Sequence, residues 1–487
     1  MLCQLVTFIS GLIVPRLILS TFGSEANGLV SSITQFLNYI ALVEGGIGSV
    51  VLTALYGPLA KKDDRKISSV LKAAENFFRQ IASIFVFYTI ALACVYPIVI
   101  KSSFSWLYVA SLTVILSFTL FIQYFFSITY KLLLQADQKM YIVQLWHALI
   151  TLLNIIAVVA SVKIFPELHF VKLCSVMLFV IQPVAYSNYV KKHYKLYKDV
   201  ESDKDSLAQR WACFGQNFAY FIHSNTDVVV LTLFSDLKAV SVYSVYLLVV
   251  KNLQSFFKAF SNAFNPIIGK AIAVNDYKQA NKYMKTYEFV VSNIATIIFG
   301  CCIYLLPSFV LIYTHGVTDA NYYRVFFSTI IILAEYIYCI REPYESVIYA
   351  AGKFKETSNS AYIEAIINIV LSVILVFKYG LEGIAVGTFI GMLYRMIYWI
   401  WFINKYIMPY PISNIVKRLS LSIGTIMISC LIVSVMDTTG SSTLILWVKN
   451  GVLCFAVFCA VTVILNLAFD KEPFLDICKR AVSKRKG

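Results

Sequence analysis

Charged residues are scarce in this sequence of 487 residues, of which 14% are charged and 59% are hydrophobic. A soluble chain of this length would carry about a quarter charged residues and would divide into two or three domains. Here apolar runs of about 18 or more residues recur along the whole chain, and no stretch resembles a detachable globular domain. The composition excludes an ordinary soluble protein and predicts an all-α, polytopic membrane protein.

The sequence also lacks the motifs of catalysis and nucleotide binding. It has no P-loop, no HExxH, no paired-cysteine spacing for a metal, and no Ser/His/Asp set outside the apolar runs. The loops between those runs are too short for an ATPase or glycosyltransferase domain. We therefore expect no enzyme activity, no metal site and no cofactor, and the energy source open to the chain is an H⁺ or Na⁺ gradient.

Disulfide bonds are not expected, because the eleven cysteines are scattered, mostly within apolar runs, and form no CxxC pair. Such cysteines act as small apolar residues. The first apolar run carries Gln4 and Arg16, which are not typical of a cleaved signal peptide. The sequence therefore predicts a first membrane span rather than a removable leader.

Fourteen apolar runs are long enough to cross a membrane. They lie near 2–20, 28–56, 80–100, 106–134, 142–161, 173–190, 213–234, 240–267, 287–313, 325–350, 358–377, 383–403, 419–436 and 444–469. The loops on one side of these spans hold 28 Lys and Arg residues and those on the other side hold 6. Basic loops stay in the cytoplasm, so the asymmetry places both termini there. It also accounts for the net charge of +15 without nucleic acid.

Two of the basic loops have an amphipathic pattern. Residues 61–81 and 275–291 place charged side chains among Ile, Leu, Val and Phe at helical spacing. This pattern predicts a short helix at the membrane interface in each loop. A solvated linker is the alternative.

The first six spans resemble the next six. The stretch "FGSEANGLVSS" (22–32) is similar to "FSDLKAVSVYS" (234–244), and an offset of 214 pairs Asn154 with Asn368. Because six is even, the copies share one orientation and are related by a pseudo-two-fold axis along the membrane normal. The predicted domains are an N-terminal lobe (1–190), a cytoplasmic loop (191–210), a C-terminal lobe (211–405), and two further spans with a basic tail (406–487).

Polar residues are concentrated in spans 1, 2, 4, 7, 8 and 10. In span 8, Lys251, Gln254 and Lys258 fall on one face at helical spacing, and two lysines there make contact with lipid unfavourable. Six helices, three per lobe, are therefore predicted to surround a polar chamber. The candidate lining residues are Arg16, Gln35, Asn38, Lys251, Gln254, Lys258 and Arg341, with the titratable residues Glu44, Asp227, Glu335, Glu342 and His223.

Each intramembrane charge also has a structural interpretation, as half of an ion pair or as a snorkelling side chain. We favour that interpretation for Glu364, Arg395 and Lys449, which lie near span ends. For Asp227, Lys251, Glu335 and Arg341 we favour the chamber, because isolated charges at membrane depth are rare without a pathway.

Span 12 carries a separate pattern of small residues. Gly383, Gly387 and Gly391 are four residues apart and share one helix face. Such a face lets two backbones approach closely in a membrane. The pattern predicts tight helix packing rather than a ligand site.

The sequence resembles the polysaccharide-transporter branch (Wzx-type O-antigen or capsule flippases) of the multidrug/oligosaccharidyl-lipid/polysaccharide (MOP) exporter superfamily. The resemblance extends over nearly the whole chain and is carried by "GLIVPRLILSTFGSEANGLVSSITQFLNYIALVEGGIGSVV" (11–51), "NTDVVVLTLFSDLKAVSVYSVY" (225–246) and "AAGKFKETSNSAYIEAIINIVLSVILV" (350–376). It implies a MOP/MATE-like fold in a bacterial cytoplasmic membrane, with two six-helix lobes around a cavity that opens alternately to either side.

The resemblance also implies a cargo, an undecaprenyl-pyrophosphate-linked polysaccharide repeat unit that moves from the cytoplasmic to the outer leaflet. By position, Arg16, Lys251 and Lys258 are the candidates for binding the pyrophosphate, since Arg and Lys pair strongly with phosphate. The acidic candidates would couple an ion or balance those cations. The implied partners are this lipid-linked oligosaccharide, membrane lipids and other polysaccharide-assembly proteins, and no nucleic acid.

Two alternatives stay open. An ion-coupled multidrug exporter would share the fold, although the basic residues of spans 1 and 8 disfavour a cationic cargo. A membrane-embedded polysaccharide polymerase or ligase belongs to a different class and would be expected to show a long outer loop with catalytic Arg or His. The outer loops of this sequence are short.

Overall fold

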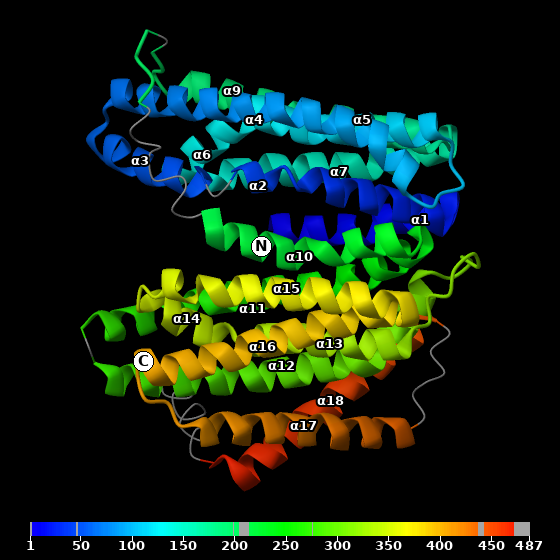
Figure 1. The fold of residues 1–487 in the computed structure, drawn as a ribbon, viewed down its shortest axis with the longest axis vertical. Helices are drawn as coiled ribbons and strands as arrows, with labels where there is room; N and C mark the ends of the chain where they lie inside the picture. Colours follow the sequence, from blue (N-terminus) through cyan, green and yellow to red (C-terminus); the bar gives the residue numbers. More distant parts are fainter. Residues whose placement is uncertain are drawn as a thin grey trace. The chain divides into compact units, whose positions relative to one another are not determined.

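The computed structural model describes residues 2–44, 47–197, 199–203, 214–274, 276–436 and 443–471, and every regular element within these ranges is helical (Figure 1). The first half contains α1 (Leu2–Asn38), α2 (Ala41–Glu44), α3 (Ile47–Lys61), α4 (Asp64–Val99), α5 (Trp106–Ile122), η1 (Gln123–Ser127), α6 (Ile128–Ala136), α7 (Met140–Ile164), α8 (Leu168–Phe179) and α9 (Ile181–His193). The second half contains α10 (Phe214–Phe234), α11 (Leu237–Ala273), α12 (Tyr277–Tyr313), α13 (Val325–Ile340), α14 (Glu342–Ala350), α15 (Phe354–Tyr379), α16 (Leu381–Tyr406), α17 (Ile412–Val435) and α18 (Leu444–Phe469). The predicted all-α class is confirmed.

The long helices have the length and surface of membrane spans. Among the described residues, eleven helices are long and apolar enough to cross a bilayer. Large apolar side chains stand on their outer surfaces, such as Ile98 (74% exposed), Ile164 (78%) and Val435 (84%). In water such exposure would be costly, and in lipid it is not. The chain is therefore a multi-pass membrane protein, although the predicted count of fourteen spans is not confirmed.

Two of the three spans that are not counted are broken or joined, and the third is predicted span 7, of which Asn225–Phe234 counts as a shorter apolar helix. Predicted spans 1 and 2 share α1, within which Gly23 has a non-helical backbone with φ of +84°. Predicted span 2 then continues in separate helical pieces, α2 and α3. Predicted span 10 is divided at Arg341, between α13 and α14, where Pro343 cannot donate a helical hydrogen bond. Broken helices of this kind escape a simple count of apolar runs.

The two amphipathic loops are helical, but they are not separate helices. Residues 64–81 form the start of α4 and residues 277–291 the start of α12, and each helix runs on without a break into its membrane span. Asp63 caps α4 by accepting the N–H of Lys66, and Asp276 caps α12 by accepting that of Gln279, each at 3.0 Å. The prediction of short interfacial helices was therefore wrong in their extent, because nothing in either segment ends the helix.

The described residues divide into two compact units. Unit 1 comprises Met1–Ser244 and Gly316–Ala320, and unit 2 comprises Val245–His315 and Asn321–Gly487. The boundary falls within α11, so packing groups α10 with the N-terminal helices, whereas the sequence repeat groups it with the second half. The lobes with bounds 1–190 and 211–405 stay a prediction.

Each unit has its own helix pairs. In unit 1, α1 packs against α7 and α4 against α5. In unit 2, α16 packs against α15 and α13, while α12 packs against α17 and α18. A Cβ atom added to Gly383 would lie 2.6 Å from the Leu375 carbonyl carbon, and one at Gly387 would lie 2.5 Å from the Ser372 hydroxyl. The close packing predicted for the glycines of span 12 is confirmed, and the partner is α15.

Candidate functional site

Unit 1 contains a seam of neutral polar side chains between α1 and the α10–α11 hairpin. Each of three α1 residues hydrogen-bonds to a partner on that hairpin, and most of these side chains are buried. The pairs are Asn27 with Ser241 (2.8 Å), Ser32 with Thr232 (2.6 Å), and Gln35 with Asn225. We call these six residues the unit 1 seam. Of its members, only Gln35 was a predicted cavity residue.

The backbones also meet closely beside this seam. A Cβ atom at Gly28 of α1 would lie 1.7 Å from the carbonyl oxygen of Leu237, so no larger residue fits there. The two stretches in contact, 22–32 and 234–244, are those whose sequences resemble each other. Equivalent segments next to a two-fold axis pack against each other in this way. The contact therefore supports the repeat that the sequence predicts.

Asp227 lies next to this seam and has a partner that the sequence did not reveal. The carboxylate is 6% exposed and accepts a hydrogen bond of 2.5 Å from the hydroxyl of Tyr243 on α11. The spacing of these residues across the α10–α11 turn gives no recognisable pattern. The predicted cationic counterparts, Lys251 and Lys258, belong to unit 2. The side chain of His223, on α10, lies outside the described residues.

The remaining unit 1 candidates are distributed along α1 and α2. Arg16 and Asn38 are half-buried on α1. Glu44, half-buried at the end of α2, accepts a hydrogen bond of 3.1 Å from the hydroxyl of Tyr124 in η1. Arg16, Asn38 and Glu44 thus lie at different points along α1 and α2.

Unit 2 contains a buried ion cluster. Glu364 of α15 accepts a hydrogen bond of 2.6 Å from Arg341 and lies 3.4 Å from Arg395 of α16. The Arg341 guanidinium lies over the rings of Tyr338 (4.6 Å) and Trp399 (5.2 Å), and that of Arg395 lies over Trp399 (4.6 Å). We call these five residues the arginine cluster. The structural ion pair favoured for Glu364 and Arg395 is thus confirmed. Arg341, for which we favoured the chamber, is held in the same buried ion cluster.

The cluster depends on the break between α13 and α14. Arg341 is the residue between the two helices and remains 4% exposed. Burial of a guanidinium requires a paired carboxylate and further contacts, which Glu364 and the two aromatic rings supply. Half-buried Glu345 of α14 is also close enough to act on both arginines. The charges of the arginine cluster are therefore largely balanced.

Lys258 adjoins this cluster from α11. Its ammonium lies 5.3 Å from the Tyr338 ring, the ring that Arg341 also contacts. Lys251 is half-buried two turns earlier on the same helix, and Gln254 is buried between them. Of the acidic candidates of unit 2, Glu335 is 3% and Glu342 7% exposed. The structure thus brings predicted residues of spans 8 and 10 together within one unit.

A second buried acidic site in unit 2 was missed. Glu288 of α12 accepts hydrogen bonds from the hydroxyls of Tyr344 (2.8 Å) and Tyr410. Asp470 accepts one of 2.7 Å from Arg418, which ties the end of α18 to α17. Glu288 lies in an amphipathic segment where a carboxylate gave no signal for burial. These contacts fasten α12 to α14 and to the segment before α17, and they fasten α17 to the end of α18.

The polar groups described above are ion pairs, tyrosine–carboxylate hydrogen bonds and amide–hydroxyl pairs. Among the described residues, no three His, Cys, Asp or Glu side chains are grouped so that they could hold a metal ion.

Comparison with known proteins gives the fold. Residues 212–374 match the family model MatE. The structure of the lipid II flippase MurJ in an inward closed conformation has a TM-score of 0.72 and 16% identity, covering 94% of this chain and 98% of that chain. An inward-facing multidrug resistance MATE family transporter of the MOP superfamily has a TM-score of 0.61 and 14% identity, covering 81% and 93%. The chain has the fold of these transporters.

The predicted MOP/MATE-like fold is therefore confirmed. A eukaryotic MATE transporter also matches, with a TM-score of 0.57 and 11% identity over 86% of this chain and 96% of that chain. No curated protein sequence matches. At these identities the likeness concerns the fold, and function must be argued from the residues.

Proposed function

We propose that the protein is a flippase of the MOP superfamily that moves an undecaprenyl-pyrophosphate-linked polysaccharide repeat unit across the bacterial cytoplasmic membrane by alternating access. The observation that carries the proposal is the likeness to the lipid II flippase, 98% of whose chain is covered. The match to the multidrug transporter covers 81% of this chain, so about a fifth of this chain has no counterpart in that structure. A flippase for a lipid-linked glycan needs no catalytic group, in keeping with a transporter rather than an enzyme.

The residue chemistry supports an anionic cargo. A pyrophosphate requires cations at membrane depth, and the proposed ones are Lys251 and Lys258 in unit 2 and Arg16 in unit 1. Both lysines are half-buried on one face of α11, beside the buried Gln254. Arg341 is held by Glu364, so its proposed part is to position Tyr338 beside Lys258.

The other candidates have proposed supporting parts. Gln35, Asn38 and Gln254 carry amides that can meet sugar hydroxyls. The titratable residues are proposed either to couple transport to H⁺ or Na⁺ or to balance the charge of the cations. They are Glu44, Asp227, His223, Glu335 and Glu342. The proposed topology has both termini in the cytoplasm, as the basic loops predict.

A complementation experiment tests the proposal. In cells that lack the gene, Lys258→Gln should restore little surface polysaccharide, because a charge-assisted contact contributes about 1.5–3 kcal/mol, or roughly tenfold or more in binding. The matched control is Lys270→Gln, on the same helix and exposed, which should restore surface polysaccharide fully. Immunoblots of membranes establish that both variants insert. Normal polysaccharide in cells without the gene would overturn the proposal.

The second candidate is an ion-coupled exporter of cationic drugs, which the MatE match over residues 212–374 favours. Growth in cationic dyes and drugs, with and without the gene, separates the two functions. A flippase predicts equal resistance in both strains and loss of polysaccharide in one. Drug sensitivity on deletion, with polysaccharide unchanged, would support the exporter instead.

A further inference from the structure

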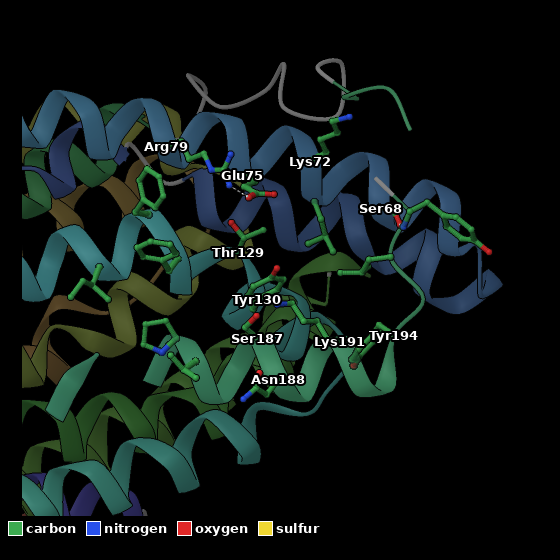
Figure 2. A pocket seen from close by; sticks show the side chains of 18 of the residues that line it. Ser68, Lys72, Glu75, Arg79, Thr129, Tyr130, Ser187, Asn188, Lys191 and Tyr194 are labelled. Atoms are coloured by element: carbon green, nitrogen blue, oxygen red, sulfur yellow. Dashed lines mark hydrogen bonds and ion pairs between the residues drawn. The ribbon is translucent and has the colours of Figure 1, made fainter. Parts of the chain in front are cut away.

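A cavity of about 850 Å³ lies within unit 1, apart from the sites described above. Its walls are α4, the η1–α6 segment, α9, and the chain that follows α9 (Figure 2). This volume falls within the range of roughly 300–1,000 Å³ that is usual for small-molecule sites. The surrounding helices belong to the end of unit 1 that carries the basic segments 57–79, 135–141 and 191–203.

The cavity is cationic on its polar side. Figure 2 shows Lys72, Glu75 and Arg79 of α4 on one side and Lys191 of α9 on the other. Arg79 pairs with Glu75 at 2.5 Å, and the Lys72 ammonium donates to the carbonyl of Val200 at 2.8 Å. In Figure 2 Lys72 points away from the cavity, toward this carbonyl, and Arg79 is balanced by Glu75, so Lys191 leaves a surplus of one positive charge. The cavity is therefore suited to an anionic group.

Hydroxyl and amide groups extend this polar side. Tyr130 of α6 hydrogen-bonds with Ser187 of α9, and Asn188 lies beside them. Together with Lys191 they offer donors to an oxygen-rich group such as a phosphate ester. Charge-assisted hydrogen bonds of this kind are the strong ones.

Another part of the cavity lining is apolar and includes side chains that are exposed on the outer surface of the helices. Phe125, Phe126 and Val184 line it, and Phe126 and Val184 are 52% and 54% exposed. Exposed apolar side chains on membrane helices face lipid tails. The Phe125 ring also lies 5.4 Å from the Arg79 guanidinium, so that one side chain connects the cationic and apolar sides. A ligand with a charged head and an apolar tail matches this division.

We propose that this cavity binds an anionic glycerophospholipid of the membrane, with its phosphate toward Lys191 and Arg79 and an acyl chain along Phe126 and Val184. The basic loops at this end predict the cytoplasmic leaflet, whose anionic lipids attract such segments. This inference goes beyond the proposed function, because the lipid is a resident of the membrane rather than the transported cargo.

The bound lipid also contacts the chain that leads toward the second half. Tyr194, Leu196 and Tyr197 line the cavity after the end of α9. This segment is fastened to α4, because the N–H of Tyr197 donates to Ser68 at 3.0 Å and Asp203 pairs with Lys66 at 2.7 Å. A lipid in the cavity therefore adds contacts that hold the segment against α4.

Native mass spectrometry of the purified, delipidated full chain tests the proposal. Phosphatidylglycerol, phosphatidylcholine, a polyprenyl phosphate and glycerol 3-phosphate are added separately at equal concentrations. We expect retention of phosphatidylglycerol above the other three, and a loss of roughly threefold to tenfold in its affinity in Lys191→Gln, as for a partly exposed charged contact. The matched control is Lys192→Gln, exposed on the same turn and outside the cavity, which should bind as wild type does.

A second variant tests whether the lipid occupies the cavity, without changing the charge of the lining. Ser187→Trp should fill the cavity and displace phosphatidylglycerol without removing a cation. Equal binding by wild type, Lys191→Gln and Lys192→Gln would overturn the proposal. So would phosphatidylcholine retained as well as phosphatidylglycerol, or a preference for polyprenyl phosphate or for glycerol 3-phosphate. Because the readout is lipid retention by purified protein, a failure of the proposed transport function would leave it unaffected.

Discussion

The unit 1 seam and the arginine cluster show two ways of burying polar groups within a membrane. The unit 1 seam is neutral, with amide and hydroxyl pairs such as Asn27 with Ser241 joining α1 to α10 and α11. The arginine cluster is ionic, with two guanidinium groups around Glu364. Interhelical hydrogen bonds in membranes contribute about 0.6 kcal/mol on average, whereas breaking a buried ion pair costs about 3–5 kcal/mol. Helix α1 is therefore expected to separate from α10 and α11 far more easily than α13, α15 and α16 separate from one another.

The largest loss of stability is expected from a substitution in the arginine cluster. Glu364→Gln leaves two buried guanidinium groups without their shared carboxylate and should destabilise the protein by about 3–5 kcal/mol. Thermal unfolding of the purified protein in detergent measures the loss. Glu382→Gln is the matched control, because it removes a partly exposed ion pair with Arg324 (3.4 Å) in the same unit and should cost about 1 kcal/mol or less. Similar melting temperatures for both variants would contradict the ionic account.

The next effect is expected where α1 meets α11. Gly28→Ala places a methyl group against the Leu237 carbonyl, and the resulting overpacking should cost about 1–3 kcal/mol. Gly11→Ala on the same helix meets nothing within 4 Å and should be neutral or slightly stabilising. Melting temperatures of the two variants check this difference. An unchanged Gly28→Ala protein would show that the helices are not in close contact.

A smaller effect is expected for one hydrogen-bonded pair of the unit 1 seam. Ser32→Ala removes the contact with Thr232 and the hydrogen bond that Ser32 accepts from Tyr96 (2.7 Å), so it should cost about 0.6–1.7 kcal/mol. Thr34→Ala serves as control, since that exposed hydroxyl donates to the carbonyl of Val30 on its own helix. A loss as large as that of Glu364→Gln would erase the distinction between the seam and the cluster.

The smallest loss of stability is expected in acid, beside the break at Gly23 within α1. Asp319 accepts the N–H (2.8 Å) and the hydroxyl (2.6 Å) of Ser24. Partial burial acts to raise the pKa of Asp319, but the bonds from Ser24 and the charge of Lys238 outweigh it and lower the pKa below its usual value. A depressed carboxyl pKa adds stability above the ordinary value of about 3.9, and this stability is lost as pH falls through the lowered pKa.

Melting temperatures measured from neutral pH down to about pH 3 test this dependence. Wild type should lose stability in the acid range, and Asp319→Asn should lose less because it has nothing to protonate there. The control Asp236→Asn changes a helix-capping residue that Asn replaces well. Identical pH profiles for wild type and Asp319→Asn would show that Asp319 does not contribute to the loss of stability in acid. The neutral pairs of the unit 1 seam do not titrate and should show no such loss.

The sequence predicted the fold class well because membrane burial leaves a strong pattern. Apolar runs, basic loops and the repeat predicted an all-α membrane protein, and the resemblance implied the MOP/MATE-like fold. Four-residue glycine spacing predicted a close-packing face on α16, and the structure shows that its partner is α15. The break at Gly23 falls in the predicted gap between spans 1 and 2. The break at Arg341 lies inside predicted span 10 and was harder to place, since a broken helix keeps the composition of a continuous one. The long helices α4 and α12 were divided too early because their charged first turns resemble loops.

The partners of the candidate residues could not be predicted from spacing. Asp227 pairs with Tyr243 across a turn, and Arg341 pairs with Glu364 across two helices. Such contacts depend on which helices are neighbours. A stripe of polar residues at helical spacing indicates that one face of a helix is polar, but not which helix it contacts. The cavity beside α4 was missed for the same reason, because Lys72, Arg79 and Lys191 lie in or near basic loops and nothing in the sequence distinguishes them from other loop residues.

Transport by the purified protein in proteoliposomes tests the central claim most directly. A fluorescent polyprenyl-diphosphate-linked oligosaccharide is placed in the bilayer, and its movement between leaflets is followed by quenching with an impermeant reagent. We predict rapid movement of the labelled lipid with wild type and with Lys270→Gln. With Lys258→Gln the movement should be at least roughly tenfold slower. Equal rates in empty and protein-containing vesicles, with every protein correctly folded, would contradict it.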